Sequence, residues 1–474
     1  MMKRIITAAA LLLLCLSAFA KLTVKEPCSD RMVLQQQSEA LVWGHASPGA
    51  AVKVTTGWDR KAYKATTDGN GVWKVKVHTP EASYNQYDIR IEGDGGKLTI
   101  RNVLIGEVWI ASGQSNMEMP VRGYFSCPVE GSSEIIANVK LQGKVRMFSV
   151  SQDQSDEPLD DVRKCSGWLD ADPRGVQWMS ATAFFFARQL NAVLDIPVGI
   201  VAFPYGGTRV ESWLPREILE AYGEPLERIE QNHYHNPFRM YNSMQHPMQG
   251  YTAKGFIWYQ GCSNVGHDDV LVERMGALVR RWREDWGDTV AAMPFYQCEI
   301  APWEGYGGSA PAFRRAQHLA AATIPNGGIV VTNDLVYPYE TGQIHPCQKR
   351  QVGERLAYLA LNRDYGYETI ACYSPEALEL RKSETNPGEL LLKVSNCSNG
   401  IDREKGIEGL EICGPDGVYV PVTRAWMEWG SGTLRVISDQ VPYPVGLRYG
   451  WADFRPGNLH SCEGLPFSPF DMKL

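Results

Sequence analysis

Four short segments of the chain combine glycines with side chains that can carry out acyl transfer. The first spans 111–118, where an apolar run leads into a turn that contains Gly113 and Ser115. A turn of this kind can expose the serine hydroxyl and direct backbone N–H groups toward the carbonyl group that the hydroxyl attacks. The alternative is an ordinary strand-to-helix connection in which Ser115 caps the helix.

The second and third segments offer hydrogen-bond donors for an oxyanion. Gly206 and Gly207 follow an apolar run, and a backbone without side chains can approach a ligand closely. Gln260 and Asn264 flank Gly261 with two side-chain amides that can donate to the same oxygen. Tight turns and turn capping by asparagine explain these residues without a catalytic role.

The fourth segment spans 342–346 and contains His345, after the last apolar run and before a helical stretch. We expect His345 to be a general base, because imidazole titrates near the working pH of most enzymes. The other histidines do not follow a strand in this way. His233 and His235 have no carboxylate or cysteine at ligand spacing, so we expect no metal site.

The four segments are positioned by an alternating pattern of strands and helices between about 105 and 365. Such alternation favours a parallel sheet with helices on both faces, and ligands bind to such sheets outside the carboxyl ends of the strands. The expected strands are 106–111, 198–203, 255–260 and 327–332, and the expected helices are 181–194, 274–286 and 349–362.

Two β-rich regions flank this α/β region, and a targeting segment precedes them. Short alternating strands with turn residues predict an N-terminal β-sandwich domain at 21–104, an α/β domain at 105–365 and a C-terminal β-rich domain at 366–474. Residues 1–20 combine a basic start, a short apolar run and a small-x-small ending, which predicts a signal peptide. We therefore expect a periplasmic or secreted protein without a membrane span.

Composition excludes some classes of function. The 47 Lys and Arg against 54 Asp and Glu give a net charge of −7, which disfavours a nucleic-acid binder that neutralises phosphates. The hydrophobic content of 44% supports several buried cores and excludes disorder as the main state. Of the 11 cysteines, the ten after residue 20 are equally compatible with disulfides and with buried thiols. The oligomeric state stays open.

The segment 106–117 resembles the nucleophile block of the sialate O-acetylesterases, which are carbohydrate esterases of the SGNH-hydrolase type. The likeness continues in order along nearly the whole chain after residue 20. The other similar segments are 32–36, 42–44, 206–208, 255–261, 344–346, 351–353, 448–452 and 464–470.

This resemblance implies a fold, an activity and a set of site residues. The fold is an SGNH-hydrolase-like α/β sheet, and the activity is the removal of O-acetyl groups from sialic acids without a metal or organic cofactor. Ser115 is the implied nucleophile and His345 the implied general base. The implied oxyanion donors are the backbone N–H of Ser115, a backbone N–H of Gly206 or Gly207, and a side-chain amide of Gln260 or Asn264.

We expect the substrate, an O-acetylated sugar or glycan, to be bound by Gln114, Arg209, Glu211 and Trp213. Arg209 can pair with a sugar carboxylate through two hydrogen bonds, or it can form a salt bridge with Glu211. Two alternatives to sialic acid deacetylation stay open. One is an acetylesterase for other acetylated polysaccharides, and the other is a catalytically degenerate carbohydrate-binding protein.

Two departures from the family pattern concern the catalytic acid. Cys262 stands where the family usually has Glu, and Gln343 stands where it usually has Asp, two residues before the histidine. Losing a triad carboxylate can cost about four orders of magnitude in rate. Asp334 or Glu340 can supply a relocated acid; otherwise Gln343 orients a Ser–His dyad as a neutral acceptor. For Cys262 the expectation is a buried, inert thiol or a partner in a disulfide.

Overall fold

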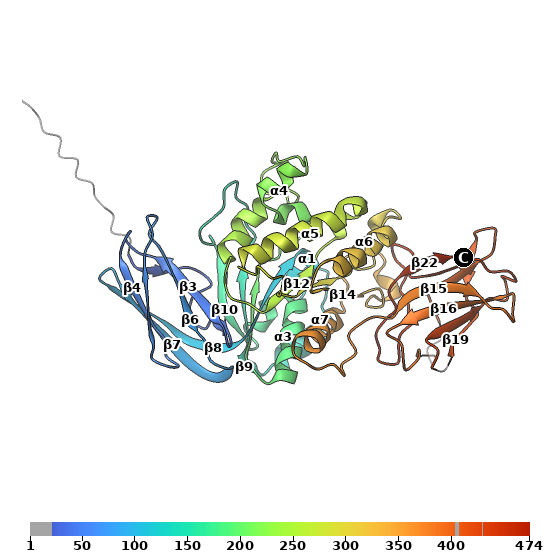
Figure 1. Cartoon of the computed structure of the whole chain (residues 1–474), viewed down its shortest axis with the longest axis horizontal. Coiled ribbons are helices and arrows are strands. Elements are labelled where there is room, and N and C mark those ends of the chain that lie inside the picture. Colours follow the sequence, from blue (N-terminus) through green and yellow to red (C-terminus); the bar gives the residue numbers. More distant parts are fainter. Residues whose placement is uncertain (1–20, 403–406, 429) are drawn as a thin grey trace, which may run out of the picture.

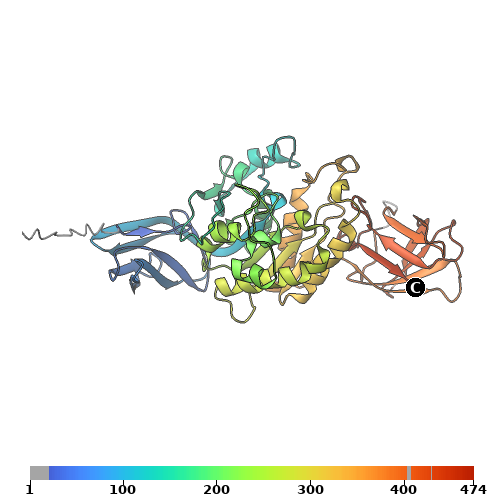
Figure 2. The ribbon, with the colours of Figure 1, turned by 90° about the horizontal axis from the view of Figure 1, so that it is seen from above.

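Three regions follow one another along the long axis of the molecule, as Figure 1 and Figure 2 show. A computed structural model of the chain describes residues 21–402, 407–428 and 430–474. A β-sandwich lies at the N-terminal end, an α/β region lies in the middle, and a second β-sandwich lies at the C-terminal end. The predicted signal peptide at 1–20 lies outside the described residues.

The N-terminal sandwich is built from strands with one buried and one exposed face. In β6 (Val72–His78), Trp73, Val75 and Val77 are buried, while Lys74 and Lys76 are exposed. Side chains of a strand alternate between faces, so this pattern places the apolar half in the core. The other strands are β1 (Thr23–Val24), β2 (Val33–Gln35), β3 (Glu39–His45), β4 (Ala51–Thr55), β5 (Ala62–Thr66) and β7 (Ser83–Gly93).

One long strand, β8 (Gly96–Gly113), belongs to both the N-terminal sandwich and the central sheet. Its first half pairs antiparallel with β7, and its second half pairs in parallel with two strands of the central sheet. From Val103 onward every residue of β8 is buried. The domain boundary predicted between 104 and 105 therefore falls inside a single strand, which ends two residues before Ser115.

The central sheet has the strand order β10-β9-β11-β8-β12-β13-β14. All of its neighbouring pairs are parallel except β10 with β9. The chain adds strands on one side of β8 and then on the other, so the carboxyl end of β8 lies where the direction of winding changes. The bounds are β9 (Leu141–Val150), β10 (Cys165–Ala171), β11 (Val198–Ala202), β12 (Gly255–Tyr259), β13 (Phe295–Cys298) and β14 (Gly327–Val330).

Two pairs of long helices cover the two faces of this sheet (Figure 1). Helices α3 (Ala181–Leu194) and α7 (Lys349–Asp364) pack on one face, and α5 (Asp268–Asp285) and α6 (Ala310–Thr323) pack on the other. The shorter helices are α1 (Ser115–Glu118), α2 (Ser132–Asn138) and α4 (Arg216–Ala221). Single turns are η1 (Val176–Trp178), η2 (Val210–Trp213), η3 (Tyr241–Gln245), η4 (His246–Met248), η5 (Cys262–Asn264), η6 (Glu304–Tyr306) and η7 (Pro338–Glu340).

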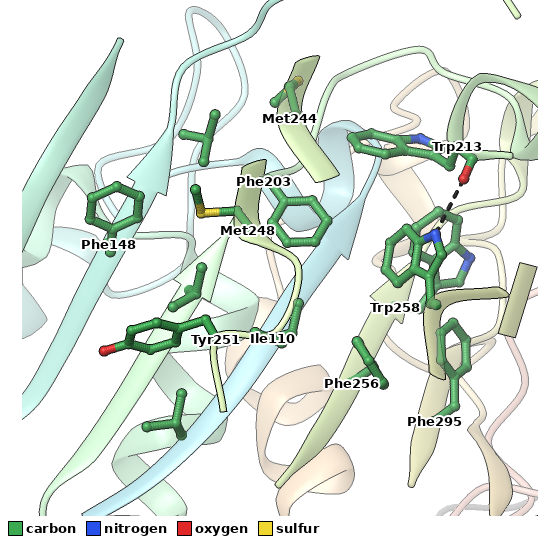
Figure 3. Packing of buried hydrophobic residues seen from close by; sticks show 14 of the residues in the cluster. Ile110, Phe148, Phe203, Trp213, Met244, Met248, Tyr251, Phe256, Trp258 and Phe295 are labelled. Atoms are coloured by element: carbon green, nitrogen blue, oxygen red, sulfur yellow. Dashed lines mark hydrogen bonds between the residues drawn. The ribbon is translucent and has the colours of Figure 1, made fainter. Parts of the chain in front are cut away.

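Aromatic side chains fill the core between the sheet and α5. Figure 3 shows Phe203, Trp213, Phe256, Trp258 and Phe295 packed together. Each of these side chains is at most 1% exposed, so their packing fixes β11, β12 and β13 relative to one another.

The C-terminal sandwich consists of two four-stranded sheets that enclose a separate apolar core. Asp453 and its neighbours contact the central region: the Arg314 guanidinium on α6 donates to the carbonyl oxygens of Ala452 at 2.7 Å and Asp453 at 3.0 Å. The strands are β15 (Glu376–Lys382), β16 (Glu389–Ser395), β17 (Leu410–Cys413), β18 (Tyr419–Pro421), β19 (Arg424–Glu428), β20 (Thr433–Ile437), β21 (Gly446–Tyr449) and β22 (Phe470–Lys473).

Within the described part of the chain, no helix has the length and apolar character needed to cross a membrane.

Gly113, the last residue of β8, requires the absence of a side chain. Its φ is +135°, and a Cβ added there would lie 2.3 Å from the carbonyl oxygen of Tyr259. We expect Gly113→Ala to lower the free energy of unfolding by about 2 kcal/mol or more, from backbone strain and the clash. Urea denaturation measures this loss. Gly69→Ala, at an exposed turn with open space around it, is the control and should change stability by less than about 0.5 kcal/mol. Equal effects at both positions would contradict the prediction.

Candidate active site

Ser115 and His345 meet at the carboxyl edge of the central sheet. Ser115 begins α1 directly after β8, and His345 lies between β14 and α7. The Ser115 Oγ atom lies 2.7 Å from His345 Nε2, although the two residues are 230 positions apart. Both residues are partly buried. The structure thus brings together the hydroxyl and the imidazole that the sequence pointed to, at a distance that permits proton transfer.

The turn that carries Ser115 is fixed by its two neighbours. The side-chain Oε1 of Gln114 accepts the N–H of Gly261 at 2.9 Å, and Gln114 is only 2% exposed. The Asn116 amide donates to the carbonyl of Ile344 at 3.0 Å, and its Oδ1 accepts from the Lys349 ammonium at 2.6 Å. Gln114, expected to bind substrate, therefore braces the turn, and Asn116 ties the serine turn to the histidine segment.

The surroundings of His345 keep its imidazole neutral at pH 7. Burial, followed by the positive charge of Lys349, lowers the pKa of His345 to about 4. Burial also lowers the pKa of Lys349, to about 8, so this side chain still carries its proton at neutral pH. A neutral imidazole can accept the Ser115 proton, as a general base requires.

The other ring nitrogen of His345 faces a sulfur atom. Cys127 Sγ lies 3.9 Å from His345 Nδ1. Gln343 does not bond to the ring, since its Oε1 accepts the backbone N–H of His345 at 3.0 Å and its Nε2 donates to Cys127 Sγ at 3.3 Å. No local pattern points to Cys127 in the sequence, because it lies in an irregular loop without a strand or helix period around it.

Neither of the two carboxylates considered as a relocated acid reaches His345. Asp334 accepts hydrogen bonds from Arg355 at 2.6 and 2.7 Å and contacts His460 Nε2 at 3.0 Å. Burial alone would raise the pKa of Asp334, but Arg355 outweighs it and holds that pKa at about 2. The two oxygens of Glu340 accept backbone N–H groups of Cys347 and Tyr337.

The assignment of Asp334 or Glu340 as the orienting acid is thus corrected, because both are committed to other partners. Among the described residues, no carboxylate hydrogen-bonds to the His345 ring.

Of the expected backbone donors, Gly206 is occupied and two others are available. The Gly206 N–H donates to Glu118 Oε2 at 2.7 Å, and burial raises the pKa of this carboxyl despite that bond. A Cβ on Gly206 would lie 3.4 Å from the Cβ of Ser115, which shows how closely Gly206 approaches this residue. In the described part of the chain, the backbone N–H groups of Ser115 and Gly207 have no hydrogen-bond acceptor.

The side-chain amides of Gln260 and Asn264 hold two loops together. Gln260 Nε2 donates to the Thr208 carbonyl at 3.0 Å and to Asn264 Oδ1 at 2.7 Å, which uses both of its hydrogens. Asn264 Nδ2 donates to Glu211 Oε2 at 3.0 Å. The expected role of Gln260 as an oxyanion donor is corrected on this ground, since its amide hydrogens bind protein acceptors.

The three remaining residues expected to bind substrate have different surroundings. Trp213 is fully buried, and its indole N–H donates to Thr208 Oγ1 at 3.0 Å; Figure 3 places it in the core, so it does not stack on a sugar. Glu211 accepts from Asn264. Arg209 Nε donates to the Ser263 carbonyl at 3.1 Å, and within the described residues Arg209 has no ion pair, with Glu211 or any other acid.

Cys262 and the other cysteines of the described residues are unpaired thiols. Burial raises the pKa of Cys262 above its usual value, so its thiol is protonated at neutral pH and unreactive. The same residues contain no cluster of three or more His, Cys, Asp or Glu side chains placed to hold a metal ion.

Comparisons with known proteins agree with one another. A family model described as carbohydrate esterase, sialic acid-specific acetylesterase, matches residues 105–362. The sialate O-acetylesterase of Pongo abelii is 28% identical over 489 residues, covering 93% of this chain and 91% of that protein. The sialate O-acetylesterase of Mus musculus is 30% identical over 408 residues, covering 73% of this chain and 74% of that protein.

A solved structure shows the same likeness in three dimensions. The crystal structure of a novel carbohydrate acetylesterase from Xanthomonas citri matches with a TM-score of 0.83 and 31% sequence identity. The match covers 95% of this chain and 99% of the Xanthomonas chain, so it includes all three regions of the fold.

Proposed function

Because the chain belongs to the carbohydrate esterase family of sialic acid-specific acetylesterases, and is thus an esterase hydrolase, we propose that it removes O-acetyl groups from sialic acids through an acyl-enzyme on Ser115. The observation that carries the proposal is the 2.7 Å contact between Ser115 Oγ and His345 Nε2. Its position at the carboxyl edge of a sheet with parallel strands supports an SGNH-hydrolase-like site.

The reaction proceeds in two acyl-transfer steps. His345 Nε2 takes the proton of Ser115 as Oγ attacks the carbonyl carbon of the acetyl ester. The tetrahedral intermediate collapses, the C–O bond to the sugar breaks, and the imidazolium returns its proton to the departing sugar oxygen. Water then attacks the acetyl group on Ser115 with His345 again as base, and acetate leaves as Oγ regains its proton.

The negative charge of each tetrahedral intermediate requires donors beside Ser115. Two backbone N–H groups have no acceptor among the described residues: that of Ser115 itself and that of Gly207, which follows Gly206. Asn264 remains a candidate third donor, since only one of its two amide hydrogens is bonded to Glu211. Donors that are already oriented stabilise the oxyanion without reorganisation, and each contributes about 3 kcal/mol to lowering the barrier.

Arg209 is the residue that supports a sialic acid over a neutral sugar. It follows the glycine pair, is partly buried, and has no ion pair among the described residues. Its charge also contributes, after burial, to the lowered pKa of the neighbouring His235. A guanidinium that lacks a protein carboxylate is suited to the carboxylate of a sialic acid, which it can bind through two hydrogen bonds.

Another acetylated polysaccharide is the second candidate substrate, favoured by the match to the Xanthomonas carbohydrate acetylesterase. The sequence of residues 1–20 supports export, so the proposed substrates are glycans of the periplasm or the cell exterior.

Acetate release from three substrates tests the proposal: 9-O-acetylated sialic acid, an acetylated neutral oligosaccharide and p-nitrophenyl acetate. For sialic acid, Arg209→Ala is expected to lower kcat/KM by about tenfold or more, as a lost charged hydrogen bond predicts, and to spare p-nitrophenyl acetate. Arg209→Lys keeps the charge but cannot form the two parallel hydrogen bonds, so its kcat/KM for sialic acid should lie between those of Arg209→Ala and the wild type. Faster turnover of the neutral oligosaccharide, with no effect of Arg209→Ala, would establish the second candidate instead.

The pH dependence of kcat/KM follows from the lowered pKa of His345. The base is active only when neutral, so the rate should rise with pH through about 4 and level off well below the usual histidine value of 6.5. Hydrolysis of p-nitrophenyl acetate between pH 3 and 8 measures this midpoint. In Lys349→Met, loss of the neighbouring charge should move the midpoint upward. A wild-type midpoint between 6 and 7 would contradict the prediction.

A further inference from the structure

The loop 120–130 places a sulfur atom on the side of His345 that faces away from Ser115. Cys127 Sγ lies 3.9 Å from Nδ1, while Ser115 Oγ lies 2.7 Å from Nε2, so the two residues occupy opposite ends of the ring. In a serine triad, the position at Nδ1 belongs to a carboxylate that holds the ring and its tautomer. Here Asp334 and Glu340 are bonded elsewhere.

The orientation of Gln343 defines what the sulfur does. The Gln343 Oε1 must face the backbone N–H of His345, because a flipped amide would set two donors against each other. The Nε2 of Gln343 therefore points its hydrogens at Cys127 Sγ, 3.3 Å away. In this contact the sulfur is the acceptor.

The tautomer of His345 leads to the same assignment. If Nε2 is to take the proton of Ser115, Nε2 must carry no hydrogen, so the ring hydrogen is on Nδ1 and points toward Cys127. We propose that Cys127 is the positioning residue of the site: its sulfur accepts the Nδ1–H of His345 and holds the tautomer in which Nε2 can act as base. This inference rests on the proposed Ser–His mechanism.

Hydrogen bonds and close contacts fix the loop that carries Cys127. The backbones of Tyr124 and Cys127 exchange two hydrogen bonds, of 2.9 and 3.1 Å. A Cβ on Gly123, whose φ is +82°, would lie 2.5 Å from the Cys127 carbonyl oxygen, so only glycine fits. The Tyr124 ring meets the His345 ring edge-on at 5.6 Å, and the Glu130 N–H donates to the Cys347 carbonyl at 2.9 Å. These contacts hold the sulfur at Nδ1.

Charged and titratable groups of several segments lie near Ser115 and the His345 ring. Lys349 of α7 is the positive group that opposes protonation of His345, and Glu118 of α1 accepts the N–H of Gly206. Cys127 and Tyr124 are the titratable groups of the loop itself that face the ring. A thiol sulfur is a weak acceptor, and 3.9 Å is longer than a carboxylate contact of about 3 Å. We therefore expect a smaller effect than that of a triad carboxylate.

The experiment compares Cys127→Ala and Cys127→Asp with the wild-type chain, using acetate release, the pH profile and ¹⁵N NMR of the His345 ring. Cys127→Ala should lower kcat by about 10- to 50-fold, against about 10⁴-fold for a triad carboxylate, with KM changed less than about twofold. In Cys127→Asp, a carboxylate at the same position should restore kcat and raise the pH midpoint by about one unit or more. Cys462→Ala, at an exposed thiol of the C-terminal sandwich, is the control and should match wild type.

The NMR measurement separates this inference from the proposed function. We expect a proton on Nδ1 of His345 in the wild type and a mixture of tautomers in Cys127→Ala, whichever acetylated sugar is the substrate. A wild-type ring protonated on Nε2 would overturn it. So would a Cys127→Ala variant that keeps the wild-type kcat and pH midpoint, or an Asp variant whose midpoint does not move. If neither the wild type nor the Cys127 variants showed turnover that depends on Ser115, but the wild-type ring carried its proton on Nδ1, the proposed Ser–His mechanism would be overturned. The contact between His345 Nδ1 and Cys127 would then still be supported.

Discussion

Replacing Ser115 with alanine is expected to lower kcat for acetate release by about 10⁴-fold or more, because the acyl-enzyme cannot form without the Oγ atom. The Ser115 Oγ is the hydroxyl at hydrogen-bond distance from His345 Nε2, and no substitute nucleophile bonds to that nitrogen among the described residues. Stopped assays with 9-O-acetylated sialic acid and p-nitrophenyl acetate measure the loss. Sugar binding should persist, since alanine removes one atom and leaves the turn bonded through Gln114 and Asn116.

The matched control is Ser112→Ala, three residues upstream of Ser115, near the end of β8. The Ser112 hydroxyl is buried and donates to the Phe203 carbonyl at 3.0 Å, so its loss should cost about 1 kcal/mol of stability. The activity of this variant should stay within severalfold of wild type. If Ser115→Ala retained more than a few per cent of wild-type turnover, the nucleophile would have to be another residue.

Replacing Asp334 with alanine is expected to lower the free energy of unfolding by about 3 to 5 kcal/mol, with little change in kcat. The change leaves Arg355, which is 8% exposed, without the carboxylate that binds it at 2.6 and 2.7 Å. It also removes the contact with His460, and so detaches the C-terminal sandwich from the central region at this point. Thermal unfolding measures the loss of stability. At temperatures where the variant stays folded, kcat should remain within severalfold of wild type.

A relocated catalytic acid would give the opposite result, with kcat reduced by orders of magnitude at nearly normal stability. Acidification provides an independent check. The pKa of Asp334 is lowered to about 2 from the ordinary 3.8, so its contribution to stability is present above pH 4 and disappears as pH falls toward 2. Between pH 5 and 2, the wild type should therefore lose more unfolding free energy than Asp334→Asn. Parallel losses in the two proteins would show that the ion pair contributes little.

Local patterns in the sequence predict much of the central fold and the meeting of Ser115 with His345. Apolar runs of strand length end in glycine turns, and those turns carry Ser115 and the Gly206–Gly207 pair. The helix expected at 181–194 has those bounds in the structure. Parallel strands share one carboxyl edge, so chemical groups that follow different strands meet there.

The surroundings of the pair depend on long-range contacts that leave no local signal. Asp334 lies on the same segment of the sequence as His345, but its carboxylate is bound by Arg355 of α7 and His460 of the C-terminal sandwich instead. Trp213 follows the glycine pair, yet its single turn directs the indole into the core. Cys127 lies at the His345 ring because Gly123 and backbone hydrogen bonds shape its loop. No hydrophobic periodicity in the sequence predicts the conformation of this loop.

The continuity of β8 has a consequence for how this architecture can be rearranged by recombination. The same strand that starts at Gly96 in the N-terminal sandwich ends beside Ser115, so this sandwich cannot be exchanged independently of the central region. A recombination crossover at the boundary of the N-terminal sandwich would interrupt β8 in its buried middle, where it is hydrogen-bonded to neighbouring strands. Lineages that inherit this esterase are therefore expected to inherit the N-terminal sandwich and the central region as one unit.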